Sequence, residues 1–197
     1  MNIALRKPRM SREDFFVWAE AQNERFEFDG FAPVAMTGGN NRHSLISLNV
    51  HAALRSYLSG KPCRPLGPDA GLRTIGDAVR YPDALVTCSK FDELAREVPG
   101  VVVVFEVLSP TSGHVDRIVK LLEYRAVASI RRYVIVEYAS AAVTVHARAE
   151  AGADWTTTAL TGEGSLDLPE IGITVPVADL YRGTELEPGS SPDAAAG

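Results

Sequence analysis

The stretch from Val101 to Phe105, four valines followed by a phenylalanine, constrains the fold of this chain more than any other. Continuous runs of β-branched residues are typical of strands buried on both faces of a sheet. We therefore expect a central strand over 101–108. Glu106 lies inside that strand, and a buried carboxylate costs several kcal/mol unless it is paired with a cation or bound to a metal. The same strand thus predicts a sheet-based core and a functional use for one acid.

Helical and strand patterns alternate along the rest of the chain, which indicates a mixed α/β domain. Near the N-terminus, Ser11 and Asp14 have capping-box spacing before a short helix, and Asp29-Gly30 is a turn signal for a hairpin. Periodicity predicts the other elements. These are helices over 41–58 and 116–127, strands over 24–28, 31–36, 70–75, 77–80, 83–88, 133–138 and 143–147, and weaker strands over 155–160 and 173–175.

The length of 197 residues suits one domain with a sizeable core. We expect a flexible N-terminus over 1–10, a domain over 11–182, and a tail over 183–197 whose small and polar composition is typical of disorder. No apolar run approaches the ~20 residues that span a bilayer, and no apolar segment of a signal peptide is evident at the start. These observations predict a cytoplasmic protein that does not enter a membrane.

The chain has two cysteines, Cys63 and Cys88, and neither belongs to a Cys-x-x-Cys motif or to a cluster of cysteine and histidine. Disulfides are rare in the cytosol, where thiols are kept reduced. We therefore expect two reduced thiols in preference to a disulfide or a zinc site.

The net charge of −5 argues against nucleic-acid binding, which usually needs a basic surface. This charge does not exclude such binding, because carboxylates gathered in a metal site contribute to that total and a bound divalent cation offsets them locally. Basic residues also cluster in two places, over 6–12 and at Arg131-Arg132. Nucleic acid therefore stays among the candidate partners.

Three charged residues at or beside expected strands point to one chemistry. Asp83 follows Tyr81-Pro82 at the head of an apolar strand, Glu106 interrupts the valine-rich strand, and Lys120 lies in the helix that follows. Mg²⁺ prefers hard oxygen ligands, commonly one or two carboxylates with water and substrate phosphate. A metal there would polarise a phosphoryl oxygen and lower the pKa of a bound water, while the lysine orients that water or stabilises developing charge. The pattern predicts metal-assisted phosphodiester hydrolysis.

Each of these residues also has an ordinary explanation. Asp83 fits turn chemistry, Glu106 fits a buried ion pair, and Lys120 fits a surface ion pair with Asp116 one helical turn away. Weaker candidates, each with an ordinary alternative as a strand, turn or capping residue, are Glu27, His43, Asp69, Ser109 and Thr111. The other histidines do not pair at metal-ligand intervals, and no Gly-rich phosphate loop of the Walker or dinucleotide type is present.

The order of these motifs resembles the Uma2 family, a widespread bacterial group with a restriction-endonuclease-like fold. The stretch Glu-Val-Leu-Ser-Pro-Thr-Ser, over 106–112, is the most specific piece of the resemblance. The other matching stretches lie over 24–30, 81–83, 116–124 and 132–136, so that the similarity covers roughly 11–186.

The resemblance implies a PD-(D/E)xK nuclease-like core, a mixed sheet flanked by helices whose acids bind Mg²⁺ or Mn²⁺. Asp83 and Glu106 correspond to the two acids of that motif. Leu108 occupies the place of the usual lysine, and members of the family carry a lysine on the following helix, which here is Lys120. Glu27 matches an early glutamate that completes the metal site. Homodimers are common among proteins of this fold, so the resemblance also implies a dimer.

Three function hypotheses follow. The first is a metal-dependent endonuclease that hydrolyses DNA phosphodiester bonds, with Asp83, Glu106 and Lys120 as catalytic residues. The second is a catalytically inactive nuclease-fold module that binds DNA or protein, which the leucine at position 108 and the negative charge favour. A third, an accessory protein that acts on RNA, is distinguished from the first by comparing DNA and RNA digestion.

Overall fold

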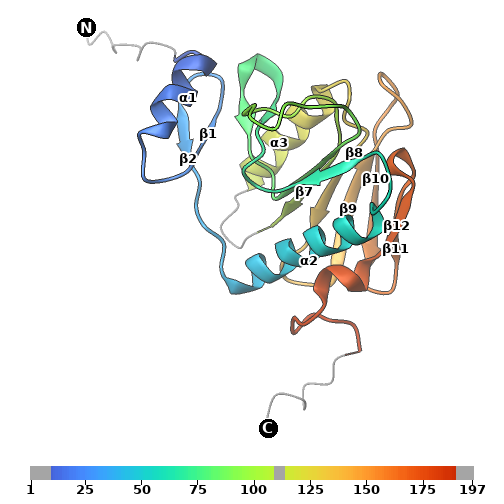
Figure 1. Cartoon of the computed structure of the whole chain (residues 1–197). Helices are drawn as coiled ribbons and strands as arrows, with labels where there is room; N and C mark the ends of the chain where they lie inside the picture. The colour runs from blue at the N-terminus through green and yellow to red at the C-terminus, as the bar shows by residue number, and fades with distance from the viewer. Residues whose placement is uncertain (1–9, 109–113, 190–197) are drawn as a thin grey trace, which may run out of the picture.

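A computed structural model describes residues 10–108 and 114–189, and its main body is built on a six-stranded mixed sheet (Figure 1). Strand β7 (Val101–Val107) lies inside this sheet, parallel to β8 (Arg132–Val136) and antiparallel to β6 (Ala84–Thr87). The valine-rich run is therefore a central strand, as predicted. Side chains at successive positions pack on opposite faces, with Phe105 in one hydrophobic cluster and Val104 in the other.

The order of strands is β10-β9-β8-β7-β6-β3, and all neighbours other than β7 and β8 are antiparallel. The remaining members are β3 (Arg64–Leu66), β9 (Ala142–Ala147) and β10 (Thr156–Thr161). Helix α2 (Asn41–Tyr57) packs on the face that holds Phe105, and α3 (His114–Ala126) contributes Tyr124 to the opposite face. This sheet with helices on both faces confirms the expected mixed α/β fold.

A separate hairpin covers the hydrophobic core on the same face of the large sheet as α2. Strands β11 (Ser165–Leu168) and β12 (Ile173–Pro176) pair with each other, and the short helix η3 (Val177–Tyr181) follows. Their apolar side chains join the same cluster as α2. The Tyr181 hydroxyl donates a hydrogen bond to the carbonyl of Ala142, which ties η3 to the end of β9.

The N-terminal unit stands beside the main body, with α1 (Arg12–Glu20) packed on a small four-stranded sheet (Figure 1). Its strands are β1 (Phe26–Phe28), β2 (Pro33–Ala35), β4 (Leu72–Arg73) and β5 (Val79–Arg80). Ser11 caps α1 by accepting a hydrogen bond from the backbone N–H of Asp14, as the capping-box spacing predicts. The Asp29 carboxylate accepts two backbone N–H bonds in the turn between β1 and β2, which confirms the hairpin.

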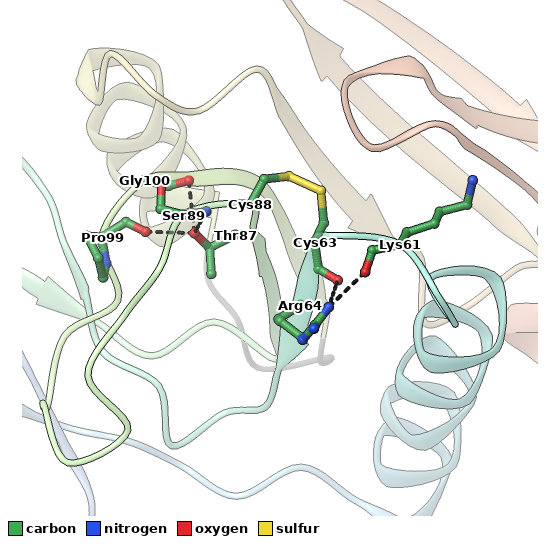
Figure 2. Close-up of a disulfide and its surroundings, with 8 residues drawn as sticks. All are labelled: Lys61, Cys63, Arg64, Thr87, Cys88, Ser89, Pro99 and Gly100. Carbon is green, nitrogen blue, oxygen red and sulfur yellow. Dashed lines mark hydrogen bonds between the residues drawn. A yellow bond between two sulfur atoms is a disulfide. The ribbon is translucent and has the colours of Figure 1, made fainter.

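The cysteine prediction is wrong, because Cys63 and Cys88 form a disulfide (Figure 2). Strand β3 pairs with β6 in the register Arg64↔Thr87, so the two cysteines come directly opposite each other. The spacing of the two cysteines in the sequence does not predict this pairing. Next to the bridge, the Thr87 hydroxyl bonds to the carbonyls of Pro99 and Gly100 (Figure 2).

Several expectations about the chain ends fall partly outside the described residues. The flexible N-terminus is described only at Met10, and the tail is described only over 183–189. Within that part of the tail, Thr184 is buried and its hydroxyl bonds to the carbonyl of Tyr181. None of the helices in the described ranges is long and apolar enough to cross a membrane.

Candidate active site

The pairing of β6 with β7 brings the two predicted acids together. The register Ala84↔Phe105 places Asp83, one residue before β6, opposite Glu106 near the end of β7. The Asp83 Oδ2 atom accepts a hydrogen bond of 2.7 Å from the backbone N–H of Val107, which fixes the carboxylate beside the strand. A cavity of about 230 Å³ opens here, lined by Asp83 and Glu106 together with Glu27, His43, Arg80 and Lys120.

Burial makes the negative charge of Glu106 unfavourable in this cavity. Burial raises the pKa of its carboxyl to about 7, and the nearby carboxylates of Asp83 and Glu27 act in the same direction. Two donors oppose that shift, since Lys120 Nζ and the Tyr124 hydroxyl lie 3.1 Å and 2.8 Å from Glu106 Oε1. Glu106 therefore forms a buried ion pair with Lys120, which is the ordinary explanation of its burial. The carboxylates of Asp83 and Glu27 lie near the same pair.

Lys120 reaches the cavity from α3 and lies between two carboxylates. Its Nζ is 3.1 Å from Glu106 Oε1 and 3.1 Å from Glu27 Oε1. Burial alone would lower the pKa of Lys120, but Glu106 and Glu27 raise it above its ordinary value, so the side chain is a cation. The alternative pairing involves Asp116, whose side chain the structure does not describe.

Glu27 lies in β1 and points into the site, although its sequence pattern fitted an outward strand residue. Its Oε1 accepts the backbone N–H of Tyr81 at 3.2 Å in addition to Lys120. Its Oε2 accepts a hydrogen bond of 3.1 Å from Arg80 Nη1. The resemblance implied Glu27 as a third metal ligand, and both of its oxygens contact cationic side chains.

His43 enters the cavity from the first turn of α2, which Asn40 caps. Its Nε2 lies 3.1 Å from the carbonyl of Val107, so this nitrogen carries the proton and donates. The same atom is 3.5 Å from Asp83 Oδ1. The hydrogen bond with Asp83 raises the pKa of His43 above its ordinary value, against the effect of burial. His43, for which the sequence allowed both a functional role and an ordinary structural one, is therefore part of the site.

Three residues of the site were missed at the sequence level: Arg80, Glu123 and Tyr124. The spacing of Lys120, Glu123 and Tyr124 at i, i+3 and i+4 places them on one face of α3, and this pattern was a usable signal. Arg80 directly precedes Tyr81-Pro82-Asp83, and its burial depends on packing that the sequence does not display.

Other candidates lie elsewhere or outside the described residues. Asp69 has an exposed side chain that pairs with Arg25 at 3.1 Å. Arg132, at the start of β8, is opposite Val103 and forms an ion pair with Glu170, away from the end of β7 that bears Glu106. Ser109 and Thr111 fall in the undescribed segment over 109–113.

The donor set fits a divalent cation held by two carboxylates. Among the side chains that the structure describes, no three histidine, cysteine, aspartate or glutamate residues are arranged to hold a metal. Asp83 and Glu106 remain adjacent, and Mg²⁺ is commonly held by one or two carboxylates with waters and substrate phosphate. Their mutual repulsion contributes to the raised pKa of Glu106, and a cation between them would relieve it.

Two known proteins are similar to this chain, one in sequence and one in structure. An uncharacterized protein, slr1290, of Synechocystis sp. is 28% identical over 178 residues, covering 89% of this chain and 93% of the relative. A crystal structure titled as a putative nuclease belonging to DUF820 from Anabaena variabilis has a TM-score of 0.67 at 14% identity. It covers 87% of this chain and 97% of that one, and it shows a shared fold.

Residues 12–178 match the Uma2 family, whose description is "Putative restriction endonuclease". This match spans the N-terminal helix, the hairpin that bears Glu27, the strands that bear Asp83 and Glu106, and the helix that bears Lys120. The chain therefore belongs to the Uma2 family.

Proposed function

We propose that this protein is a metal-dependent endonuclease that hydrolyses phosphodiester bonds of DNA. The observation that carries the proposal is the adjacent pair Asp83 and Glu106 in one cavity with the Lys120 ammonium. Buried like charges are costly, so their retention beside a cation favours a chemical role. The family description as a restriction endonuclease supports a nucleic-acid substrate.

Asp83 and Glu106 would hold the cation, Mg²⁺ or Mn²⁺. When bound, such an ion polarises a phosphoryl oxygen and lowers the pKa of a water. Lys120 supplies a positive charge at the same cavity, where it orients the attacking water or stabilises charge that develops on the phosphate. His43 holds the strand end in place, because its Nε2 bonds to the Val107 carbonyl while the Val107 N–H bonds to Asp83.

The test combines metal binding with cleavage in the same samples. We expect calorimetry to detect Mg²⁺ and Mn²⁺ binding to the wild type, and a supercoiled plasmid to be nicked in their presence. Asp83→Asn and Glu106→Gln should lose both properties. Asp69→Asn is the matched control, because it removes an exposed acid away from the cavity and should change neither. Full nicking activity in Asp83→Asn or Glu106→Gln would refute the assignment.

A catalytically inactive module that binds DNA or protein is the second candidate, and Leu108 favours it. This residue is 5% exposed and packs in a hydrophobic cluster, so no cation comes from the position where the nuclease motif has its lysine. The module hypothesis predicts DNA or protein binding without nicking under either metal. Binding that survives in Glu106→Gln while the wild type never nicks would select it.

A further inference from the structure

A chain of alternating charges runs from the cavity through the four-stranded sheet of the N-terminal unit (the N-terminal sheet) and returns to α3. It begins with Glu106 and Lys120, continues through Glu27 and Arg80, and ends at Glu123. Each link is an ion pair of 2.6 to 3.1 Å between nitrogen and oxygen. Four of these side chains are no more than 12% exposed, and Lys120 is 21% exposed. Such order and burial exceed what surface ion pairs usually show.

Arg80 and Glu123 form the most constrained link. Arg80 Nε donates to Glu123 Oε2 at 2.7 Å, and Arg80 Nη2 donates to Oε1 at 2.6 Å. The Thr74 hydroxyl adds a third bond to Oε2 at 3.1 Å. Two parallel bonds between planar groups fix orientation as well as distance. Arg80 uses its remaining Nη1 to hold Glu27 Oε2.

The contacts of Glu27 indicate that it holds a lysine rather than a metal. Oε1 accepts bonds from Lys120 and from the backbone N–H of Tyr81, and Oε2 accepts from Arg80. A divalent ion bound to Glu27 would lie beside two cationic side chains, and like charges repel at this range. Asp83, by comparison, faces a backbone N–H and His43.

We propose that Arg80 and Glu123 are positioning residues for Lys120, and that Glu27 transmits their effect instead of serving as a metal ligand. Glu123 orients Arg80, Arg80 orients Glu27, and Glu27 together with Glu106 sets the place of the ammonium. The consequence for catalysis rests on the proposed nuclease function. The positioning itself does not, because it concerns only contacts within the chain.

The competing explanation is that Arg80 and Glu123 only hold the N-terminal sheet against α3. A matched control separates the two roles. Arg132 and Glu170 form a similar two-bond pair, at 2.8 Å and 3.0 Å, at the other end of the sheet. Arg132→Lys therefore disturbs an equivalent ion pair without touching the cavity, and Arg80→Lys and Glu123→Gln disturb the pair under test.

The first measurement is the acylation rate of each lysine by an amine-reactive ester, followed by mass spectrometry. Lys120 is one of four lysines in the chain, and the exposed Lys90 serves as an internal standard. We expect Arg80→Lys, Glu123→Gln and Glu27→Gln to raise the rate at Lys120 relative to Lys90 by about fivefold or more, as expected from the loss of about one buried hydrogen bond. Arg132→Lys should leave the ratio unchanged.

The second measurement separates metal binding from turnover. In Arg80→Lys, Glu123→Gln and Glu27→Gln, we expect the Kd for Mn²⁺ to stay near the wild-type value. The kcat for nicking should fall on the order of 10²-fold at unchanged KM, as displaced catalytic groups do. Glu106→Gln, by contrast, should lose Mn²⁺ binding. Arg132→Lys should match the wild type in both.

Each outcome decides the proposal. If Glu27→Gln weakens Mn²⁺ binding as much as Glu106→Gln does, Glu27 is a ligand and the proposal is wrong. If the acylation rate of Lys120 relative to Lys90 is the same in Arg80→Lys and Glu123→Gln as in Arg132→Lys, the Arg80–Glu123 pair is only structural. A wild type that never nicks DNA refutes the nuclease function alone, and the acylation ratio still decides the positioning. Glu123→Gln keeps the side-chain volume and one acceptor, so it decides the result if Arg80→Lys does not fold.

Discussion

Glu106 combines burial with two nearby like charges, and both effects favour its neutral form. Its pKa of about 7 exceeds the ordinary value of 4.5, and burial is the largest cause. Lys120 and the Tyr124 hydroxyl favour the charged form but do not cancel the shift. The carboxyl therefore changes protonation near neutral pH, where a cation competes with a proton for the same oxygens.

This shift predicts how stability depends on pH in the metal-free protein. Between about pH 4.5 and about pH 7, the folded state binds a proton at Glu106 that the unfolded chain releases, so stability falls as pH rises through this window. The loss is at most about 3 kcal/mol. Glu106→Gln should remove this part of the slope. Urea unfolding in a chelator across the window measures it, and equal slopes for wild type and variant would contradict the prediction.

At the scale of elements, the disulfide ties the edge strand β3 to β6, and β6 follows Asp83 directly. Cys63 and Cys88 are separated by 25 positions, so the bridge closes a loop of moderate length. We expect the double variant Cys63→Ser with Cys88→Ser to lower the free energy of unfolding by about 2–4 kcal/mol.

Denaturant titration with and without dithiothreitol checks this expectation. The reductant should lower the stability of the wild type toward that of the double serine variant. It should leave the variant itself unchanged. A wild type that is insensitive to the reductant and no more stable than the variant would show that the bridge contributes nothing.

Strand β3 also shows where sequence patterns fail for an element. Arg64–Leu66 was not predicted, because it is short and contains Pro65, which normally argues against a strand. The strand lies at the edge of the sheet, where a missing N–H can face away from the ladder. The long valine-rich strand and the 17-residue helix α2 were predicted because their apolar patterns run for several turns or pleats. Without β3, the partner of Cys88 could not be identified.

At the scale of the whole molecule, the sequence indicated which residues form the cavity better than it indicated what holds them. Asp83, Glu106 and Lys120 stand out because each is a charge beside an apolar run. Arg80 and Glu123 do not, because their pairing joins residues 43 positions apart in the sequence and depends on how the N-terminal sheet meets α3. Ion-pair partners across such distances follow from tertiary packing, which local patterns do not encode.

The net charge of the whole chain leads to the last prediction, which concerns DNA binding. A net charge of −5, with Asp83 and Glu106 in the cavity, opposes a phosphate backbone unless a cation lies between them. We expect Ca²⁺, which takes the same oxygen ligands, to lower the Kd for a labelled DNA duplex by about tenfold or more relative to a chelator, the equivalent of about 1.4 kcal/mol. Fluorescence anisotropy at fixed ionic strength measures this change.

The variant that combines Asp83→Asn with Glu106→Gln gives the sharper half of that prediction. Because it removes both carboxyl groups of this pair, including the negative charge that Glu106 carries above about pH 7, it should bind DNA more tightly than the wild type in the chelator at pH 8. It should then gain nothing from Ca²⁺, since the ligands are gone. Asp69→Asn with Asp167→Asn removes the same charge from exposed positions and should keep the Ca²⁺ response. A Ca²⁺ response that persists in the cavity variant would place the cation elsewhere on the protein or on the DNA alone.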